Sequence, residues 1–424
     1  MHARLTSVSR FGFLISLLVA MTLSGSALAA PAGPDVTVFS LPNITNYGSA
    51  NGIRGYSVGT TSCNIGDAPL NWCNQSGGCG LGTTSADHPV IAQNMYRLKN
   101  GRFDQIGAGW LKHGFTSLNQ SSSGCGSGTC SQPALGGRQL GVGCTDPYSS
   151  GLNGSWPLGR KSEVNDTTGV FPYPFTQGGA QSVAWNQRVA VKESDMDSAL
   201  NPGARFFVEG HYVAPDDAQT GNGLNNASYR EVTVSAGSFG LNLQGTTVRE
   251  KAAIEVWPTI DSTVELINVD VPSVPPQRFH VARKVTEVTP GQLWHYEYAI
   301  HNMNSDRGAD QLSIVFAGNT IFSGVGFKDI DAHSNEPYDT TDWTSATSAD
   351  TVQWTTPPFP SAPNNANALR WATMYNFWFD ANRPPSEITT HNLRLFKAGS
   401  PASMAFLENL SFVFANGFEG ASGD

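Results

Sequence analysis

The sequence predicts an all-β protein with two β-sandwich-like domains, the first of them loop-rich and stapled by disulfides. Three observations support this prediction. Short segments of alternating apolar and polar residues recur along the chain, and turn residues separate them. Glycine and proline number 45 and 25 in 424 residues, and together with Asn and Asp they interrupt almost every stretch that could form a long helix. All six cysteines lie in the first third of the chain.

The alternating segments are the predicted strands. They cover residues 95–98, 103–106, 205–213, 229–235, 247–257, 263–269, 279–288, 293–302, 311–316, 351–355, 374–379 and 392–396. Two pairs form predicted hairpins, because Asn100-Gly101 and Thr289-Pro290-Gly291 are short turn sequences between them. Many short strands with turns between them are typical of β-sandwiches.

The first 29 residues are predicted to be a secretory signal peptide. Arg4 and Arg10 precede an apolar run over 11–23, and Ala27-Leu28-Ala29 ends the segment with small residues. The apolar run is shorter than the roughly 20 residues that a membrane-spanning helix needs. We therefore expect the mature protein to be secreted, either to the extracellular space or to the periplasm.

The rest of the chain divides by composition. We expect a Cys-rich, loop-decorated β domain over 31–270 and a β-sandwich domain over 278–400. A proline-rich linker is expected at 271–277, and a C-terminal tail follows at 401–424. The linker prediction rests on Pro272, Pro275 and Pro276, which would keep this segment extended.

The charge pattern excludes some partners. The formal net charge is -9, and the loss of the two leader arginines would take it to -11. An acidic chain with only 14% charged residues lacks the basic stripe that nucleic acid requires. The sequence also predicts no membrane span after the leader.

The cysteines are predicted to form three disulfides, because their number is even and the compartment is oxidising. They are Cys63, Cys73, Cys79, Cys125, Cys130 and Cys144. The close pairs Cys73 with Cys79 and Cys125 with Cys130 are sterically plausible, although six cysteines allow 15 connectivities. Zinc is the alternative, but paired C-x-x-C spacings are absent.

The mature chain contains no H-E-x-x-H, no Walker loop and no C-x-x-C-H, so none of these motifs assigns a catalytic class. The candidate catalytic residues are therefore Asp87, His88, His113 and His211, which lie in or beside predicted loops, where sites are common. A carboxylate beside a histidine would orient the imidazole for proton transfer or for metal binding.

Two metal hypotheses remain. The acidic segment with Asp329, Asp331, His333, Glu336 and Asp339 suggests a calcium site, because carboxylate oxygens suit calcium. The EF-hand spacing is absent, and a solvated acidic loop is the alternative. His280, His295 and His301 on neighbouring predicted strands suggest a copper or zinc site, with ordinary packed histidines as the alternative.

An aromatic segment suggests ligand binding. Trp371, Tyr375 and Trp378 lie near several asparagines, and exposed rings beside amides are suited to stacking on sugars. On a strand, Tyr375 and Trp378 point to opposite faces, so one face must belong to the core.

Several segments resemble a group of secreted bacterial proteins of unassigned function. These segments are residues 88–94 (HPVIAQN), 110–115 (WLKHGF), 143–148 (GCTDPY), 225–230 (NNASYR) and 304–307 (NSDR). The resemblance spans most of the mature chain and implies a secreted protein, without an activity.

The sequence thus leaves three functional hypotheses. The first is an extracellular binding or surface-associated protein, glycan-binding and calcium-stabilised, with an extracellular polymer or glycan as partner. The second is a secreted enzyme, either metal-dependent or using a carboxylate pair, that acts on extracellular polymer. The third is a structural component of an extracellular assembly.

Overall fold

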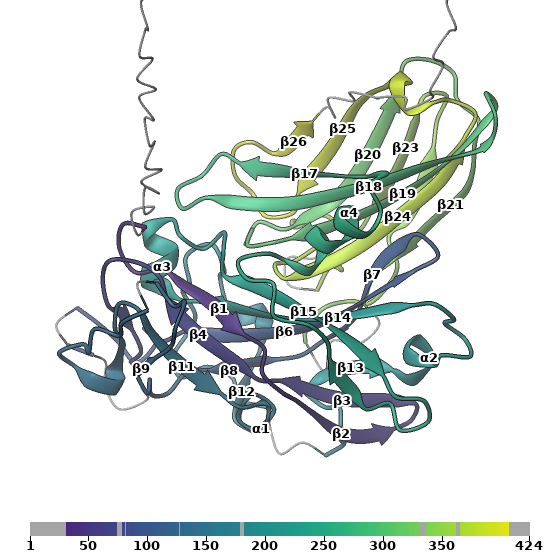
Figure 1. Ribbon diagram of the computed structural model, residues 1–424. Coiled ribbons are helices and arrows are strands. Elements are labelled where there is room, and N and C mark those ends of the chain that lie inside the picture. The colour runs from purple at the N-terminus through teal and green to yellow at the C-terminus, as the bar shows by residue number, and fades with distance from the viewer. Residues whose placement is uncertain are drawn as a thin grey trace, which may run out of the picture.

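The computed structural model describes residues 31–73, 79–80, 82–126, 128–178, 182–330, 334, 336–361 and 365–406. The predicted signal peptide and residues 407–424 of the predicted tail lie outside these ranges. The chain forms an N-terminal region below and a C-terminal region above in the view of Figure 1.

A ten-stranded sheet dominates the N-terminal region. Its strands are, in order, Leu241–Leu243 (β16), Ala227–Val234 (β15), Arg205–Val213 (β14), Val90–Lys99 (β6), Arg102–Ala108 (β7), Val189–Lys192 (β13), Ile53–Val58 (β3) and Ile44–Ala50 (β2), and Leu111–His113 (β8) connects Leu158–Gly159 (β12) to β6. All of its strand pairs are antiparallel. Asn100 and Gly101 join β6 to β7 with φ of 50° and 77°, which confirms the predicted tight turn.

Two smaller sheets complete the N-terminal region. One has four strands, Val36–Ser40 (β1), Thr60–Asn64 (β4), Cys144–Tyr148 (β11) and Gln120–Ser121 (β9), and the other pairs Gln139–Leu140 (β10) with Leu70–Asn71 (β5). The helices are short: Ser150–Asn153 (α1), Glu193–Met196 (α2), Pro215–Thr220 (α3) and Trp257–Ile260 (α4). Buried side chains such as Val38, Tyr56, Trp72, Met95 and Tyr212 form one core beneath these sheets.

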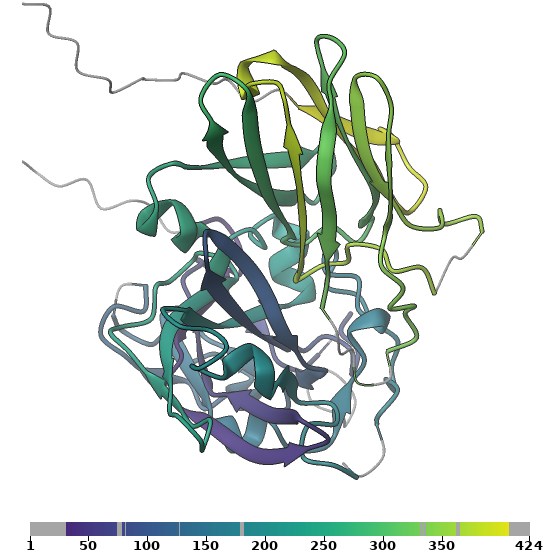
Figure 2. The same cartoon turned by 90° about the vertical axis from the view of Figure 1, so that its right-hand side faces the viewer.

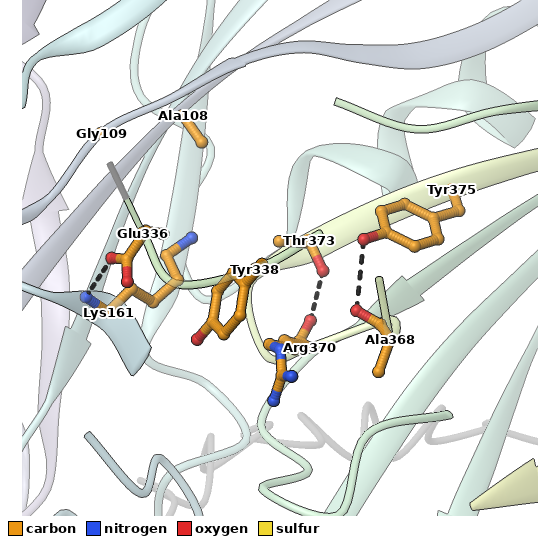
Figure 3. A pocket seen from close by; sticks show the side chains of 9 residues that line it. All are labelled: Ala108, Gly109, Lys161, Glu336, Tyr338, Ala368, Arg370, Thr373 and Tyr375. Carbon is orange, nitrogen blue, oxygen red and sulfur yellow. Dashed lines mark hydrogen bonds between the residues drawn. The ribbon is translucent and has the colours of Figure 1, made fainter. Parts of the chain in front are cut away.

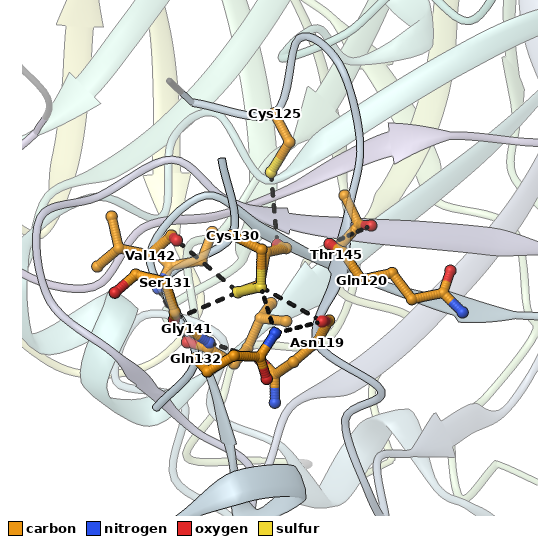
Figure 4. Close-up of a disulfide and its surroundings, with 12 residues drawn as sticks. Asn119, Gln120, Cys125, Cys130, Ser131, Gln132, Gly141, Val142 and Thr145 are labelled. Atoms are coloured by element: carbon orange, nitrogen blue, oxygen red, sulfur yellow. Dashed lines mark hydrogen bonds between the residues drawn. A yellow bond between two sulfur atoms is a disulfide. The ribbon is translucent and has the colours of Figure 1, made fainter. Parts of the chain in front are cut away.

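The three predicted disulfides are present, but one predicted pair is wrong. Cys73 bonds Cys79 as expected, whereas Cys125 bonds Cys63 and Cys130 bonds Cys144. The pairing of β4 with β11 places Cys63 opposite Thr145, next to Cys144. The loop between Cys125 and Cys130 therefore lies across two neighbouring strands and is bonded to each of them. Figure 4 shows Cys130 against Asn119, Gln132 and Gly141, which belong to the loops around this link.

The C-terminal region is a sandwich of two five-stranded sheets. The first contains Val264–Val271 (β17), Gln277–Thr289 (β18), Leu293–Asn302 (β19), Thr373–Ala381 (β24) and Phe322–Lys328 (β21); the second contains Thr344–Thr347 (β22), Thr351–Thr355 (β23), Ala309–Phe316 (β20), Ile388–Leu395 (β25) and Ser403–Phe406 (β26). Figure 2 shows the two sheets facing each other. Their core is rich in aromatic rings, among them Tyr296, Trp354, Phe377 and Phe379. An all-β fold with a loop-rich, disulfide-bonded first part is thus confirmed.

Two segments that connect the two regions in the sequence differ from their predicted structure. Strand β17 pairs with β18, and Val271 lies opposite Gln277. The proline-rich segment expected to be a linker therefore closes a hairpin within one sheet. The predicted strand over 247–257 is wrong: Val248 forms only an isolated bridge to Tyr229, and the segment continues into a 3-10 turn, Ala253–Val256, and α4, in which Pro258 follows a fully buried Trp257.

The two regions share a hydrophobic core. Phe103 of β7, Trp257 of α4 and Met374 of β24 belong to one buried cluster. Buried hydrogen bonds reinforce the contact, since Met374 N donates to Gln105 Oε1 at 2.7 Å and Asn376 Nδ2 donates to Phe103 O at 2.9 Å. The contact is therefore packed and hydrogen-bonded like a domain interior.

Candidate functional site

Two of the predicted catalytic histidines lie side by side in the N-terminal region. His88 Nε2 is 2.9 Å from His113 Nδ1, and His88 Nδ1 is 2.8 Å from Ser85 O. Burial lowers the pKa of His88 to about 4 and holds the pKa of His113 well below its usual range. Both rings are therefore neutral near pH 7, and each can donate one proton and accept another.

Aromatic rings surround this histidine pair. The ring of Phe175 stacks on His113 with centroids 3.5 Å apart, and the ring of Phe171 contacts both imidazoles at 5.0 Å. Tyr173 lies at the edge of this group, 6.4 Å from His88 and 37% exposed. Trp156 is 54% exposed, and its indole nitrogen donates to the main-chain oxygen of Gly178.

Local pairing explains how these aromatic residues meet. Strand β12 pairs with β8, so Gly159 lies opposite Leu111, and a further bridge joins Gly159 to Gln177. A Cβ atom on Gly159 would lie 2.3 Å from His113 Nε2 and 3.0 Å from the Phe175 ring. Only glycine at this position therefore allows β12 to pack beside His113 and Phe175.

The other two predicted catalytic residues do not join the pair. The carboxylate of Asp87 accepts a hydrogen bond from Thr84 N and closes a turn. His211 lies on β14 with its Nε2 3.7 Å from Asp166 Oδ2. The ring of His211 also meets the Trp371 ring edge-on, with centroids 5.9 Å apart.

His211 belongs to a buried polar cluster between the two regions. His301 of β19 is 1% exposed, and the rings of His280 and His301 stack with centroids 5.8 Å apart. Burial, His280, His211 and Lys161 together hold the pKa of His301 well below its usual range. Both ring nitrogens of His211 and of His301 lack a hydrogen-bond partner within the described part of the protein.

Lys161 is the cation of this cluster. Its Nζ donates to Ala372 O at 3.2 Å and lies 5.3 Å from the centre of the Trp371 ring, while its main-chain nitrogen donates to Glu336 Oε1 at 2.6 Å. Burial lowers the pKa of Lys161 to about 8, and the nearby Glu336 carboxylate opposes part of that shift. Near neutral pH the amine therefore loses its proton more readily than an exposed lysine.

A small cavity adjoins Lys161. Figure 3 shows its lining side chains, with Glu336 beside Lys161 at the left, Tyr338 and Arg370 in the middle and Tyr375 at the right. The guanidinium of Arg370 lies over the Tyr338 ring at 4.0 Å. The space open to water molecules is about 20 Å³. This space suits about one water molecule and excludes a polymer.

The predicted calcium loop is only partly described. Asp331 and His333 lie outside the described residues. Asp329 accepts from Asn367 Nδ2, Glu336 accepts from the main chain at 161 and 162, and Asp339 accepts from Thr341. These three carboxylates have separate partners. Among the described residues, no group of three or more His, Cys, Asp or Glu side chains is placed to hold a metal ion.

The three aromatic residues predicted to bind a ligand are covered. Trp371 and Tyr375 are 4% and 2% exposed, and their polar atoms donate to Val164 O and Asn367 Oδ1. Trp378 is half-buried, with the Arg102 guanidinium 3.7 Å above its ring, and a Cβ atom on Gly326 would lie 2.2 Å from the indole. None of these rings presents a free face to a sugar.

Four residues of the candidate site were not predicted from the sequence: Lys161, Asp166, Trp156 and Tyr173. Lys161 and Asp166 carried no motif, and only their buried positions between the regions single them out. Trp156 and Tyr173 lie beside Pro157 and Pro174 in a segment without alternation. An aromatic residue in a polar, proline-containing loop could have indicated a binding surface. Such a residue lies outside the predicted strands and therefore has no predicted place in the core.

Comparisons with known proteins identify no family. No family model matches the chain, and no curated protein matches its sequence. Among solved structures, the N-terminal domain of an adhesin from Streptococcus gordonii is 9% identical, with 89% of this chain and 96% of that chain covered and a TM-score of 0.19. A score at that level carries no argument about this protein.

The described features establish a broad class. All six cysteines are disulfide-bonded, which is typical of proteins that fold in an oxidising compartment outside the cytoplasm. None of the helices in the described ranges is long and apolar enough to cross a membrane. The chain is thus a disulfide-bonded β protein, and its disulfides are consistent with an extracellular location.

Proposed function

We propose that the protein is an extracellular binding protein that holds a neutral glycan on one surface of its N-terminal region. This aromatic surface consists of Trp156, Tyr173, Phe175 and the histidine pair behind them. The observation that carries the proposal is the exposure of two aromatic side chains: Tyr173, at 37%, lies beside the buried Phe175 ring, and Trp156, at 54%, is tied to the same segment by its hydrogen bond to Gly178 O.

Stacking supplies the binding mechanism. An exposed ring offers an apolar face to the C–H side of a sugar, while neighbouring amides and hydroxyls bind the sugar hydroxyls. Gln177 is exposed two residues after Phe175, and its main chain bridges to Gly159, so an amide side chain is available on the same segment. The pairing of β8 with β12 fixes this segment, which lowers the entropy lost on binding.

The charge of the chain favours a neutral ligand. The formal net charge is -9, and charged residues make up only 14% of the sequence. A negative protein repels polyanions at long range, whereas stacking on a neutral polysaccharide carries no such cost.

Affinity electrophoresis tests this proposal. Wild-type protein is run through gels that contain insoluble-fibre extracts, chitin oligomers or soluble neutral glucans and mannans. We expect retardation by at least one polymer and a loss of at least about tenfold in affinity for Trp156→Ala, since one aromatic ring contributes about 1–2 kcal/mol. Val274→Ala is the matched control, because Val274 is 97% exposed in the distant β17–β18 hairpin.

The proposal fails if no polymer retards the wild type. It also fails if Trp156→Ala is retarded as strongly as the wild type on the polymer that binds. Circular dichroism of each variant separates loss of binding from loss of fold.

A secreted enzyme is the second candidate. Lys161 supports it, because a buried lysine with a pKa of about 8 beside Glu336 can act as a general base near neutral pH. Turnover of a small extracellular substrate that Lys161→Met abolishes, with its melting temperature retained, would favour this function over simple binding.

A further inference from the structure

Four oxygen-bearing side chains meet at the start of the N-terminal region. Asp35 precedes β1, Asp217 lies in α3, and Asn225 and Asn226 precede β15. The sequence contains no motif at these positions, since they come from three separate segments.

Hydrogen bonds tie these side chains into one unit. Asn226 Nδ2 donates to Asp217 Oδ2 at 2.7 Å, and Asn225 Nδ2 donates to Asp35 Oδ2 at 3.2 Å. Val36 N donates to Asp217 Oδ1 at 2.9 Å, which joins α3 to the beginning of β1. The two carboxylates and the two amides therefore lie within one small volume.

Three oxygen atoms of this unit are buried without a donor. Asp35 Oδ1, Asn225 Oδ1 and Asn226 Oδ1 have no hydrogen-bond partner within the described part of the chain. Asp35, Asp217 and Asn226 are 1%, 0% and 2% exposed. Buried acceptors without partners normally cost about 1–3 kcal/mol each, so a structure with three together calls for a positive partner.

No basic side chain supplies that positive charge. Within the described ranges, neither Asp35 nor Asp217 forms an ion pair with lysine, arginine or histidine. Two buried carboxylates without a counter-charge are costly. A bound cation would remove this cost.

We propose that Asp35, Asp217, Asn225 and Asn226 bind a calcium ion. Calcium accepts six to eight oxygen ligands at about 2.3–2.6 Å, and it takes carboxylate, amide and main-chain oxygens together. The set contains oxygen ligands and no imidazole or thiolate, which disfavours zinc and copper. Main-chain oxygens or water fill the remaining positions.

Gly223 lies beside this set: a Cβ atom there would be in van der Waals contact with Asp217 Oδ2 at 3.7 Å and Asn226 Nδ2 at 3.8 Å. The calcium ion would join the start of β1 to α3 and to β15, and so it would stabilise the N-terminal region independently of any glycan.

Calcium titration of the full mature chain tests the site. Wild-type protein, stripped with EDTA and dialysed, is titrated with CaCl2 by calorimetry and melted with and without the ion. We expect one bound calcium per chain and a melting temperature several degrees higher with calcium than with EDTA. Asp35→Asn should weaken calcium binding by at least about tenfold, because it removes one ligand charge.

Two further measurements make the outcome decisive. Asp339→Asn is the matched control, since Asp339 is an exposed carboxylate with local partners, and it should bind calcium like the wild type. If the wild type binds no calcium, or if Asp35→Asn binds it as tightly as the wild type, the proposed site is wrong. The wild-type titration tests whether calcium binds even if a variant fails to fold.

Discussion

The N-terminal region is built from sheets of uneven size, short strands and long loops, whereas the C-terminal region is a regular sandwich of two five-stranded sheets. Three disulfides hold the N-terminal loops, and none occurs in the described C-terminal strands. The C-terminal core instead relies on stacked aromatic rings such as Tyr296 and Phe379, whose centroids are 4.6 Å apart. Paired strands satisfy the hydrogen bonds of their own backbone groups, so the C-terminal region is stable without covalent links. Long irregular loops lack these regular hydrogen bonds, and disulfides hold them in place instead.

The same difference extends to buried polar groups. In the N-terminal region Glu209 is fully buried and accepts from Asn94, Tyr96 and Ala253 N, at 2.9, 2.9 and 2.7 Å. In the C-terminal region the buried Arg283 extends its guanidinium to Glu265, which is 40% exposed. Loops that are pinned from within can hold side chains such as Trp156 on the surface, and this is where we place the function.

Breaking the long-range disulfide should have the largest effect. Cys63 and Cys125 are 62 residues apart, so the double variant Cys63→Ala/Cys125→Ala should lose about 4 kcal/mol of unfolding free energy. Urea denaturation measures the loss. The disulfide between Cys73 and Cys79 spans a sequence separation of only 6, so Cys73→Ala/Cys79→Ala should cost about 2 kcal/mol. Equal losses would show that loop length does not govern stability in this region.

Removing the buried Glu209 carboxylate should have the next largest effect. Glu209→Ala leaves three donors without an acceptor, and we expect a loss of about 3 kcal/mol in unfolding free energy. Glu209→Gln keeps one acceptor oxygen and should lose less. A loss below about 1 kcal/mol for the alanine variant would mean that water replaces the carboxylate.

The smallest expected effect depends on pH and lies at the edge of the C-terminal region. His295 Nδ1 lies 2.7 Å from Asp380 Oδ1, and its Nε2 lies 3.5 Å from Glu297 Oε2. Hydrogen bonds to Glu297 and to Asp380 raise the pKa of His295. A raised folded-state pKa stabilises the protein fully below about pH 6.5, and the contribution disappears as pH rises through the folded-state pKa.

His295→Gln should therefore lower the unfolding free energy at pH 5.5 and leave it unchanged at pH 9. The side chain is 36% exposed, so solvent limits the effect to roughly 0.5 kcal/mol. Denaturation at the two pH values measures it. An equal loss at both values would assign the effect to packing instead of charge.

Local sequence predicted most strands and a tight turn, but it did not predict contacts between distant segments. The hairpin at Asn100-Gly101 was predicted because its turn type is encoded by two residues. The partner of Cys125 was not, because it depends on the pairing of β4 with β11. Trp371 and Tyr375 were candidates for binding because alternation shows that two faces exist and does not show which face is covered.

The candidate site was even less accessible from sequence. His88 and His113 were named without knowledge that they touch, and His211 proved to belong to a different cluster. Lys161, Asp35 and Asn226 became candidates because they are buried polar side chains. Their burial arises only when distant segments pack together, and local sequence does not show it.

Comparing two tryptophans, one in each region, tests the central claim most directly. Trp156→Ala removes an exposed ring of the N-terminal region, and Trp378→Ala removes a half-buried ring of the C-terminal region that lies beneath Arg102. The retardation of each protein by a polysaccharide-containing gel is measured for both variants and for the wild type. We predict that Trp156→Ala loses retardation and Trp378→Ala keeps it. Loss of retardation in Trp378→Ala alone would contradict the account and place the binding surface in the C-terminal region.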